Sequence, residues 1–477
     1  MSYFLQSAPL HSTRHLRAVG TSFQWQSPSV KFCLRRNLSG HKVSRPQMIS
    51  DVRLKRTRPG DVVRIGHMTD LEGHLEFFKR SVRLSSVLEL REQESSSSSS
   101  PSCRLEFIRE NDIFVFGGDV CDHGVGDQII AESLIDFKLR HPERVFLLAG
   151  NRDINKMQLT SSVVPYFLEN EKVGIEKLKH FLKRKLNCPN AFELRRKALK
   201  AVSPGEEVDD LAVTLSFIES VKPGGFMTEY LRLAQLGVVI EDTLYVHGAI
   251  TEKSVGTVPR TEKVYSNLRK WIQALNEFAE QEVTEWQRSP TEHGKYLINY
   301  QMPGGFDGKS VVYANWWKPG SSPFFPRSIP ESVAAFLADS NIKNVITGHA
   351  PLGDSPTVIR HDLKDITVVA CDTSYSDRLA PDKRGEAISE ALVVLTAQDG
   401  HVESRVRIHG SLCNGQEFDT YVVDSIPFLG RPSKSPPGGW IKLGLGNGNC
   451  LVCMVPKNPK HPFEIHQKSV HVSNLAI

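Results

Sequence analysis

The sequence predicts an α/β protein, because short apolar segments alternate with a segment of helical length and each apolar segment ends in polar residues. Gln128–Arg140 is amphipathic and long enough for a helix, and it lies between the second and third apolar segments. Five segments rich in β-branched and aromatic residues are typical of buried strands: Val62–Met68, Ile113–Phe116, Val145–Leu148, Leu244–Val246 and Val345–Thr347. Strands that deliver polar side chains at one edge are how α/β proteins build a site.

Two long segments between these strands are expected to be helical insertions, at about 155–235 and 255–330. The first contains basic helical stretches such as Glu176–Leu186, whose charged face is expected to be solvated. The second is expected to contain a helix over 262–287, because five apolar residues recur there at helical spacing: Val264, Leu268, Trp271, Leu275 and Phe278. The low-complexity segment 92–102 (EQESSSSSSPS) is expected to be a solvated loop.

The core domain is expected over residues 60–410. Near its end, Ile366–Ala370 predicts a strand and Ala391–Ile408 predicts a hairpin that turns at Asp399-Gly400. Residues 411–477 are rich in Gly and Pro and contain short apolar runs, so we expect a small β-rich C-terminal region there.

The composition is that of a globular protein, with 40% hydrophobic and 24% charged residues among 477. No run approaches 18 apolar residues, so no membrane span is expected. Residues 1–50 hold 7 Lys and Arg and no Asp or Glu, which leaves 52 basic and 54 acidic residues for the remainder. This near-neutral remainder gives no electrostatic reason to expect nucleic acid as a partner.

The N-terminal segment has the composition of an organellar transit peptide. It is basic, contains nine serines and lacks carboxylates. We expect a transit peptide over about residues 1–55, and the pair Arg35-Arg36 followed by Asn-Leu-Ser favours the mitochondrion. A plastid address, or a disordered basic tail on a cytoplasmic protein, stays open as an alternative.

Eight cysteines are too sparse for a disulfide framework. Cys450 and Cys453 form a CxxC pair on a predicted strand, where residues three apart point to opposite faces. No second pair of Cys or His lies nearby in the sequence, so they are interpreted as small core residues rather than as zinc ligands.

Five motifs follow the predicted strands in a fixed order. They are D-x-E-G-H from Asp70, G-G-D-x-x-D-x-G from Gly117, G-N-R-D from Gly150, V-H-G from Val246 and G-H-x-P-x-G-D from Gly348. Each is weak alone, but the ordered set resembles the calcineurin-like metallophosphoesterase superfamily, especially the branch with phosphoprotein phosphatases and bacterial diadenosine-tetraphosphatases. The resemblance covers about residues 60–395 and implies two mixed β-sheets flanked by helices.

The resemblance also implies a centre for two divalent metal ions. Asp70 and Glu72 would bind the first ion, and Asp119 would bridge both. Asn151, His247 and His349 would hold the second. Oxygen and imidazole ligands suit Mn, Fe or Zn, and the extra carboxylate of Glu72 favours Mn. Such a centre activates water for attack on phosphorus, so the implied partner is a phosphorylated substrate, whose identity stays open.

Three residues depart from the pattern of the phosphoprotein phosphatases. Glu72 and Arg152 each replace a histidine, and His123 replaces an arginine that binds phosphate. Arginine is a poor proton donor but grips phosphate through two parallel N–H groups. We therefore expect Arg152 to bind phosphate and His123 to transfer a proton, which exchanges the roles of these two positions. The alternative is that His123 is an ordinary loop residue. Asp122 and Asp153 would orient these groups.

Three functions remain open from the sequence. The leading one is a metal-dependent phosphatase that hydrolyses a phosphate ester or anhydride. The second is a nucleotide-type pyrophosphohydrolase, because the G-N-R-D form also occurs in bacterial UDP-diacylglucosamine pyrophosphohydrolases of this superfamily. The third is a catalytically weak, metal-binding interaction module, because position 152 lacks the usual histidine.

Overall fold

The computed structural model describes most of the chain from residue 45 onward. The described ranges are 45–54, 58–93, 102–316, 326–361, 363–374, 383–399, 401–422, 428–433, 439–454 and 466–475. The chain divides into Met1–Lys42 and Val43–Ile477, and all described residues belong to the second unit. Most of the expected transit peptide therefore lies outside the described residues.

One six-stranded sheet carries the first three predicted strands. Its order is β14-β13-β12-β2-β5-β6, in which β2, β5 and β6 are parallel and the other neighbours are antiparallel. The bounds are β2 Val62–Met68, β5 Ile113–Phe116, β6 Val145–Leu147, β12 Ile388–Gln398, β13 His401–Ser411 and β14 Glu417–Tyr421. The predicted hairpin is confirmed, because β12 and β13 pair from Ile388 with Ser411 to Gln398 with His401.

A second six-stranded sheet carries the other two predicted strands. Its order is β1-β7-β8-β9-β11-β10, and β8, β9 and β11 run parallel. The bounds are β1 Asp51–Val52, β7 Gly237–Ile240, β8 Thr243–Val246, β9 Asn344–Thr347, β10 Thr357–Arg360 and β11 Thr367–Ala370.

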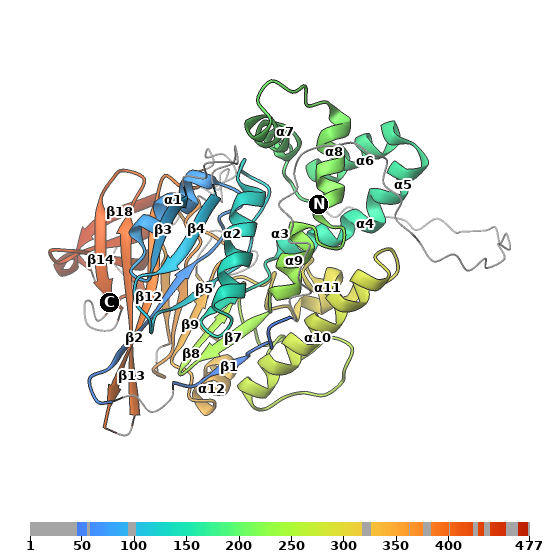
Figure 1. Cartoon of the computed structure of the whole chain (residues 1–477). Helices are drawn as coiled ribbons and strands as arrows, with labels where there is room; N and C mark the ends of the chain where they lie inside the picture. The colour runs from blue at the N-terminus through green and yellow to red at the C-terminus, as the bar shows by residue number, and fades with distance from the viewer. Residues whose placement is uncertain are drawn as a thin grey trace, which may run out of the picture. The chain divides into compact units, whose positions relative to one another are not determined.

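The two sheets pack face to face, as Figure 1 shows. Ile65 and Val115 of the first sheet share a buried apolar cluster with Val238 and Ile346 of the second. Helices cover the outer faces, where α1 (Leu75–Leu84) contacts β12, α2 (Asp127–Arg140) contacts β6 and α10 (Leu268–Arg288) contacts β7. The mixed α/β architecture expected from the sequence is confirmed.

The first insertion is entirely built of short helices and lies in the green segment of Figure 1. Its elements are α3 Asn151–Asn155, η1 Lys156–Gln158, α4 Leu159–Ser162, α5 Val164–Glu169, α6 Glu171–Arg184, α7 Ala191–Val202, α8 Asp210–Ser220 and α9 Phe226–Leu233. The second insertion adds α10, α11 (Lys295–Tyr300) and η2 (Gly305–Gly308), and α12 (Glu331–Asp339) precedes β9.

The helix expected over 262–287 begins later than its apolar spacing indicated. The side chain of Asn267 caps α10 by accepting a hydrogen bond from the backbone N–H of Lys270 at 3.1 Å. Val264 lies before this cap and is 70% exposed, so it does not belong to the apolar face of the helix.

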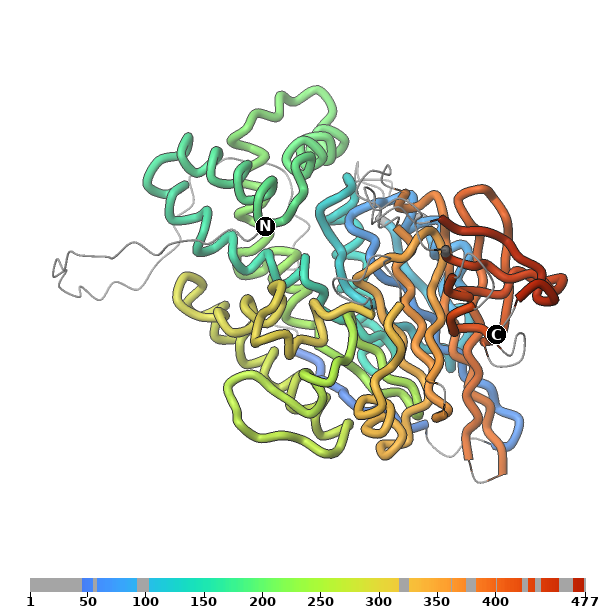
Figure 2. Tube along the Cα trace, turned by 180° about the vertical axis from the view of Figure 1, so that it is seen from behind, coloured from blue at the N-terminus to red at the C-terminus, as the bar shows by residue number. Residues whose placement is uncertain are grey.

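The C-terminal region contributes β14 to the first sheet, and its later strands form a separate four-stranded sheet beside the sandwich, drawn in red in Figure 2. Its elements are β15 Pro432–Ser433, β16 Gly439–Gly446, β17 Asn449–Met454, β18 His466–His471 and η3 Val472–Asn474. β16 contacts both β10 and β14. Cys450 and Cys453 are both buried, in different apolar clusters, which agrees with their predicted placement on opposite faces of the strand.

Two sequence expectations need correction. Residues up to 55 were expected to form a tail, but Asp51–Val52 form β1 and pair with Val239–Ile240. The expected loop 92–102 overlaps a hairpin of β3 (Leu88–Gln93) and β4 (Ser102–Phe107), because its end residues belong to these strands. The alternation of Cys103, Leu105 and Phe107 with polar residues was a signal for β4 that the sequence analysis did not use.

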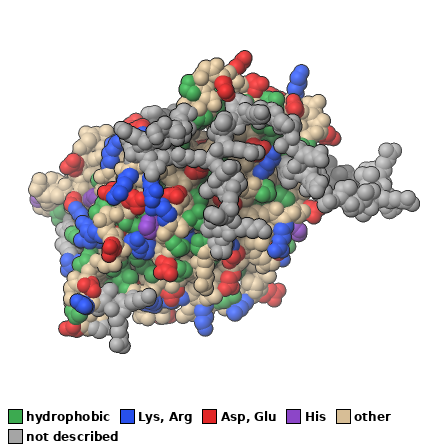
Figure 3. Space-filling model, in the orientation of Figure 1, with side chains coloured by type: hydrophobic (Ala, Val, Ile, Leu, Met, Phe, Trp, Pro, Cys, Tyr) green, Lys and Arg blue, Asp and Glu red, His purple; other side chains and the backbone are tan. Residues whose placement is uncertain are grey.

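Two properties of the described residues relate to the composition: the distribution of surface charge and the apolarity of the helices. On the face shown in Figure 3, basic and acidic side chains of the described residues are interspersed. Within the described part of the chain, no helix combines the length and apolarity that crossing a membrane requires.

Candidate metal centre

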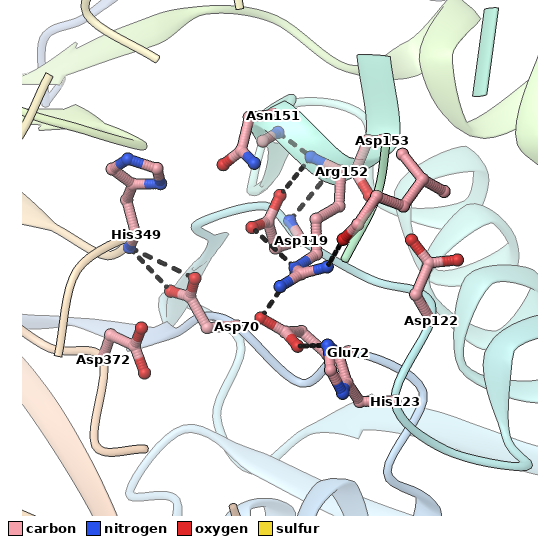
Figure 4. A network of polar contacts seen from close by, with 12 residues as sticks. Asp70, Glu72, Asp119, Asp122, His123, Asn151, Arg152, Asp153, His349 and Asp372 are labelled. Carbon is pink, nitrogen blue, oxygen red and sulfur yellow. Dashed lines mark hydrogen bonds and ion pairs between the residues drawn. The ribbon is translucent and has the colours of Figure 1, made fainter. Parts of the chain in front are cut away.

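The predicted ligands lie at the carboxyl ends of strands in both sheets. They are Asp70 and Glu72 after β2, Asp119 after β5, Asn151 after β6, His247 after β8 and His349 after β9. Parallel neighbouring strands deliver the residues that follow them to the same edge, which is why ligands distant in the sequence meet here. Figure 4 shows most of them converging on one region.

Several of these residues have left-handed backbone conformations that are rare outside glycine. The φ angles are 52° at Asp70, 45° at Glu72, 59° at Asp119 and 74° at His349, and Asp122 nearby has 106°. Each such residue stores of order 1–3 kcal/mol of strain, and such outliers cluster at functional sites.

Two glycines permit the close approach of these loops. At Gly118, with φ of 101°, an added Cβ would lie 2.6 Å from the backbone nitrogen of Gly150. At Gly348, an added Cβ would lie 2.2 Å from a carboxylate oxygen of Asp70. A side chain at either position would push the ligand-bearing loops apart.

One group of donors surrounds what we name the second metal position: Asp119, Asn151, His247 and His349. Ligand atoms of Asp119, His247 and His349 all lie within 4.8 Å of one another. Nε2 of His247 is 3.5 Å from Oδ2 of Asp119 and 3.2 Å from Oδ1 of Asn151. The four side chains therefore face a common point.

Each histidine of the second metal position is held by one ring nitrogen and leaves the other available. Nδ1 of His247 lies 2.7 Å from the carbonyl oxygen of Gly117, and Nε2 of His349 lies 3.0 Å from that of Tyr313. Backbone carbonyls accept N–H hydrogen bonds, so the opposite nitrogens are the ones that can bind a metal once they are deprotonated. This arrangement fits a divalent cation.

The pKa values of the two histidines depend on burial and on the neighbouring carboxylates. Burial disfavours the imidazolium of His247, but the adjacent Asp119 carboxylate outweighs it and raises the pKa of His247 to about 10. Burial lowers the pKa of His349 to about 3. Without metal, His247 therefore carries a proton at neutral pH, which a bound cation would displace.

A second group of donors surrounds the first metal position: Asp70, Glu72 and Asp119, also within 4.8 Å of one another. Asp70 is oriented by the hydroxyl of Thr69 at 2.6 Å and by the backbone N–H of His349 at 3.0 Å. Burial, followed by repulsion from Asp372, raises the pKa of the Asp70 carboxyl well above its usual range. A cation at the first metal position would relieve this repulsion.

Glu72 differs from the other carboxylates because cationic groups surround it. Its Oε1 accepts a hydrogen bond from Nε of Arg152 at 2.9 Å, and its Oε2 lies 3.0 Å from Nε of Arg384. The ring of His123 approaches the same oxygen at 3.4 Å. The side chains are 4%, 18% and 14% exposed for Glu72, Arg152 and Arg384, so this ion-pair cluster is largely shielded from water.

Arg152 connects the centre to the first insertion. Its backbone N–H donates to Oδ1 of Asp119 at 2.8 Å, and Nε donates to Glu72. Nη1 donates to the carbonyl oxygen of Leu186 at 3.3 Å and lies 3.0 Å from the sulfur of Cys188. The guanidinium is thus held in place between the ligand loops and the α6–α7 connection (Figure 4).

Asp153 orients the ligand loops rather than a catalytic side chain. Its carboxylate accepts backbone N–H groups of Asp119 at 2.8 Å, Val120 at 2.9 Å and Gly150 at 2.8 Å. These bonds tie the loop after β5 to the loop after β6. The sequence analysis expected Asp153 to orient Arg152 or His123, whereas its carboxylate binds backbone N–H groups of these two loops.

Asp122 has a different partner from the one expected. Its Oδ2 accepts a hydrogen bond from Nζ of Lys156 at 2.5 Å, and both side chains are buried. His123 instead lies against Glu72 and, at 3.3 Å, the sulfur of Cys188, and burial lowers its pKa. The expectation that Asp122 orients His123 or Arg152 is therefore replaced by a buried ion pair with Lys156.

Three residues of the centre were missed by the sequence analysis: Arg384, Lys156 and Cys188. Lys156 follows Arg152 by one helical turn, so its spacing along α3 was an available signal. Arg384 and Cys188 carry no comparable signal, because each reaches the site only through the folding of a distant segment.

Comparisons with known proteins place this geometry in a family. The sequence profile of the calcineurin-like phosphoesterases matches residues 63–353. A cold-active protein-tyrosine phosphatase of a psychrophilic Shewanella species is 13% identical, with a TM-score of 0.40 over 78% of this chain and 82% of that chain. A protein serine/threonine phosphatase of Saccharomyces cerevisiae is 11% identical, with a TM-score of 0.35 over 76% and 84%. No curated protein matches the sequence.

The matched span begins in β2, ends just after His349 and covers more than half of the chain. It therefore includes all the residues of the first and second metal positions. The chain belongs to the calcineurin-like phosphoesterases.

Proposed function

We propose that the protein is a metal-dependent phosphatase with a dinuclear centre. The observation that carries the proposal is Asp119, which belongs to both groups of donors and can bridge two cations. Asp70 and Glu72 complete the first metal position, and Asn151, His247 and His349 complete the second. Two bound cations would supply charge to the phosphate oxygens and an activated water for in-line attack.

The protein's own residues would prepare the centre for this reaction. Asp153 fixes the two loops that carry Asp119 and Asn151, so that the donors are in place before substrate binds. Arg152 presents a permanent positive charge beside Asp119 and can hold a phosphate oxygen. His123, 3.4 Å from Glu72, carries an imidazole that can transfer a proton.

The donor set favours Mn over softer ions at the first metal position. All three of its donors are carboxylates, whereas the second metal position has two imidazoles, one amide and one shared carboxylate. Hard oxygen ligands suit Mn or Mg, and mixed nitrogen and oxygen ligands suit Mn, Fe or Zn. Mn is the ion that suits the ligands of both metal positions.

A specific observation favours anhydrides as substrates. Arg152 stays charged and is fixed between Glu72 and Leu186, so it cannot protonate a leaving group. A phosphate leaving group from an anhydride needs little protonation, whereas an alkoxide from an alkyl ester needs a proton donor. A nucleotide-type pyrophosphohydrolase is therefore the second candidate function.

The test replaces Asp119 with Asn and measures metal content and turnover of p-nitrophenyl phosphate, a phosphoserine peptide and ADP with added Mn. We expect loss of metal and a decrease in kcat on the order of 10²-fold or more, because the bridging carboxylate is removed. Asp112→Asn is the matched control, since Asp112 is a buried aspartate at the opposite end of β5.

Three outcomes separate the candidates, with circular dichroism showing that each variant is folded. An Asp119→Asn variant that keeps both its metal and its turnover contradicts the dinuclear proposal. A wild type that prefers ADP to esters supports the pyrophosphohydrolase. A wild type that binds Mn but hydrolyses none of the three substrates supports the interaction module instead.

A further inference from the structure

Lys442 on β16 is a buried cation with no role in the sequence motifs. Its side chain is fully buried, and burial lowers its pKa to about 8. Nζ donates to the carbonyl oxygen of Leu352, to that of Ser355 at 3.1 Å and to Oε1 of Gln467 at 2.9 Å. Burying an ammonium is unfavourable unless all its N–H groups are satisfied, and here three carbonyl oxygens satisfy it.

Two of these acceptors belong to one short segment, the Leu352–Ser355 loop, which begins three residues after His349. Other residues of the C-terminal region hold the same loop. Oδ1 of Asp354 accepts a hydrogen bond from Nε2 of Gln467 at 2.5 Å, and its Oδ2 accepts the backbone N–H of Cys413 at 3.0 Å. The loop is therefore tied to β16, to β18 and to the turn after β13.

Gly353, in the middle of the loop, lies so close to the side chain of Gln467 that an added side chain would force one of them to move. Gly353 has a φ of 79°, and an added Cβ would lie 2.6 Å from the carboxamide of Gln467. The backbone of the loop thus lies directly against the side-chain carboxamide of Gln467. Such an approach, together with a buried lysine, indicates that this connection is specific rather than incidental packing.

His349 itself needs support from its surroundings. It has a left-handed backbone, with a φ of 74°, and only the surrounding contacts can hold a non-glycine residue there. Its backbone N–H and its Nε2 are held by Asp70 and Tyr313. The contacts with Asp70 and Tyr313 hold the backbone N–H and the ring of His349. The Leu352–Ser355 loop holds the segment that follows His349 in the chain.

We propose that the C-terminal sheet is a positioning element of the metal centre, in which Lys442 and Gln467 hold the Leu352–Ser355 loop and thereby fix His349 at the second metal position. The inference rests on the proposed function, since it requires that His349 binds a metal. It gives a role to a sheet that lies beyond the span shared with the family, which ends at residue 353. Lys442 and Gln467 are positioning residues and touch neither metal nor substrate.

The experiment measures Mn binding by equilibrium dialysis in the full-length protein. Lys442→Met removes the three N–H donors while it keeps the apolar stem, and Gln467→Ala removes the contact with Asp354. We expect the dissociation constant of Mn at the second metal position to rise by about 10- to 100-fold in Lys442→Met, the range for outer residues that orient metal ligands. Gln467→Ala should change it in the same direction. The control is Lys468→Met, an exposed neighbour on β18 that should change nothing.

A merely structural lysine would lower stability without changing Mn affinity, so urea unfolding of the metal-free protein is measured alongside. The decisive variant combines Lys442→Met with His349→Ala. If Lys442 acts through His349, Lys442→Met weakens Mn binding in the wild type but not in the His349→Ala protein. Equal weakening in both backgrounds overturns the inference.

The failure of this inference is distinguishable from that of the proposed function. A wild type that binds no Mn refutes the dinuclear centre and, with it, this inference. A wild type that binds two Mn ions, with unchanged affinity in Lys442→Met and Gln467→Ala, refutes the positioning role alone. If Lys442→Met does not fold, Gln467→Ala decides the question by the same cycle with His349→Ala, because Gln467 is only partly buried.

Discussion

Glu72 and Arg152 stand where the motif resemblance leads us to expect two histidines, and we predict that these two residues are energetically coupled. They form one ion pair, with 2.9 Å between Nε of Arg152 and Oε1 of Glu72. Glu72→Gln should destabilise the fold by about 3–5 kcal/mol, because it leaves the guanidinium groups of Arg152 and Arg384 shielded from water around an uncharged amide.

Arg152→Met should have a smaller effect, of about 1.5–3 kcal/mol. It removes a charged hydrogen bond, but Arg384 and His123 still balance the Glu72 carboxylate. In the double variant, Arg152 is no longer present to be left beside an uncharged amide, and only Arg384 loses the Glu72 carboxylate. Its destabilisation should therefore fall short of the sum of the single effects by about 1–3 kcal/mol.

The assay is urea unfolding of the four proteins in the presence of a chelator, followed by circular dichroism, so that metal binding does not contribute to stability. The matched control is the exposed pair Glu89 and Arg91, 3.0 Å apart, whose cycle should give about 0–1 kcal/mol. A coupling energy of the Glu72 and Arg152 cycle within about 0.5 kcal/mol of zero would refute the reasoning. The two departures from the family pattern would then be independent.

Two further predictions concern neighbouring residues. Arg152→His should increase kcat on alkyl phosphates by about 10²-fold and decrease it on anhydrides, because it introduces a proton donor and removes a fixed charge; equal changes on both substrate classes in steady-state assays would contradict this. Lys156→Met should destabilise the fold by about 3–5 kcal/mol in urea unfolding, because it leaves Asp122 buried without its cation. Adding Asp122→Asn should restore part of that loss, and a Lys156→Met effect below about 1 kcal/mol would mean that the pair is not a stabilising element.

The strands could be predicted from local apolar patterns, whereas the candidate ligands were inferred from the resemblance of the motifs that follow these strands to a known family. Apolar segments such as Val62–Met68 became strands with the same bounds, and the polar residues after them met at one edge. The start of α10 could have been placed better, since Asn267 before Leu268 is a recognisable helix cap.

The contacts that set the chemistry of the centre could not be predicted in the same way. Asp122 and His123 are adjacent in sequence, yet the first turns to Lys156 and the second to Glu72. Arg384 reaches Glu72 from the segment before β12, and Lys442 reaches the Leu352–Ser355 loop from another sheet. Such pairs depend on tertiary packing, which periodicity and local spacing do not encode.

The left-handed residues of the centre have a consequence for how this protein can evolve. Asp70, Glu72, Asp119 and His349 occupy backbone conformations that glycine would adopt with less strain. Selection for thermal stability alone would therefore favour glycine at Asp70, Asp119 and His349, and every such replacement would remove a metal donor. Glu72 differs, because its ion pairs with Arg152 and Arg384 also stabilise the fold. The donor side chains at the other three positions therefore indicate selection on the side chains themselves. A library of variants sorted only for resistance to heat should accumulate glycine at these three positions and lose metal binding as it does so.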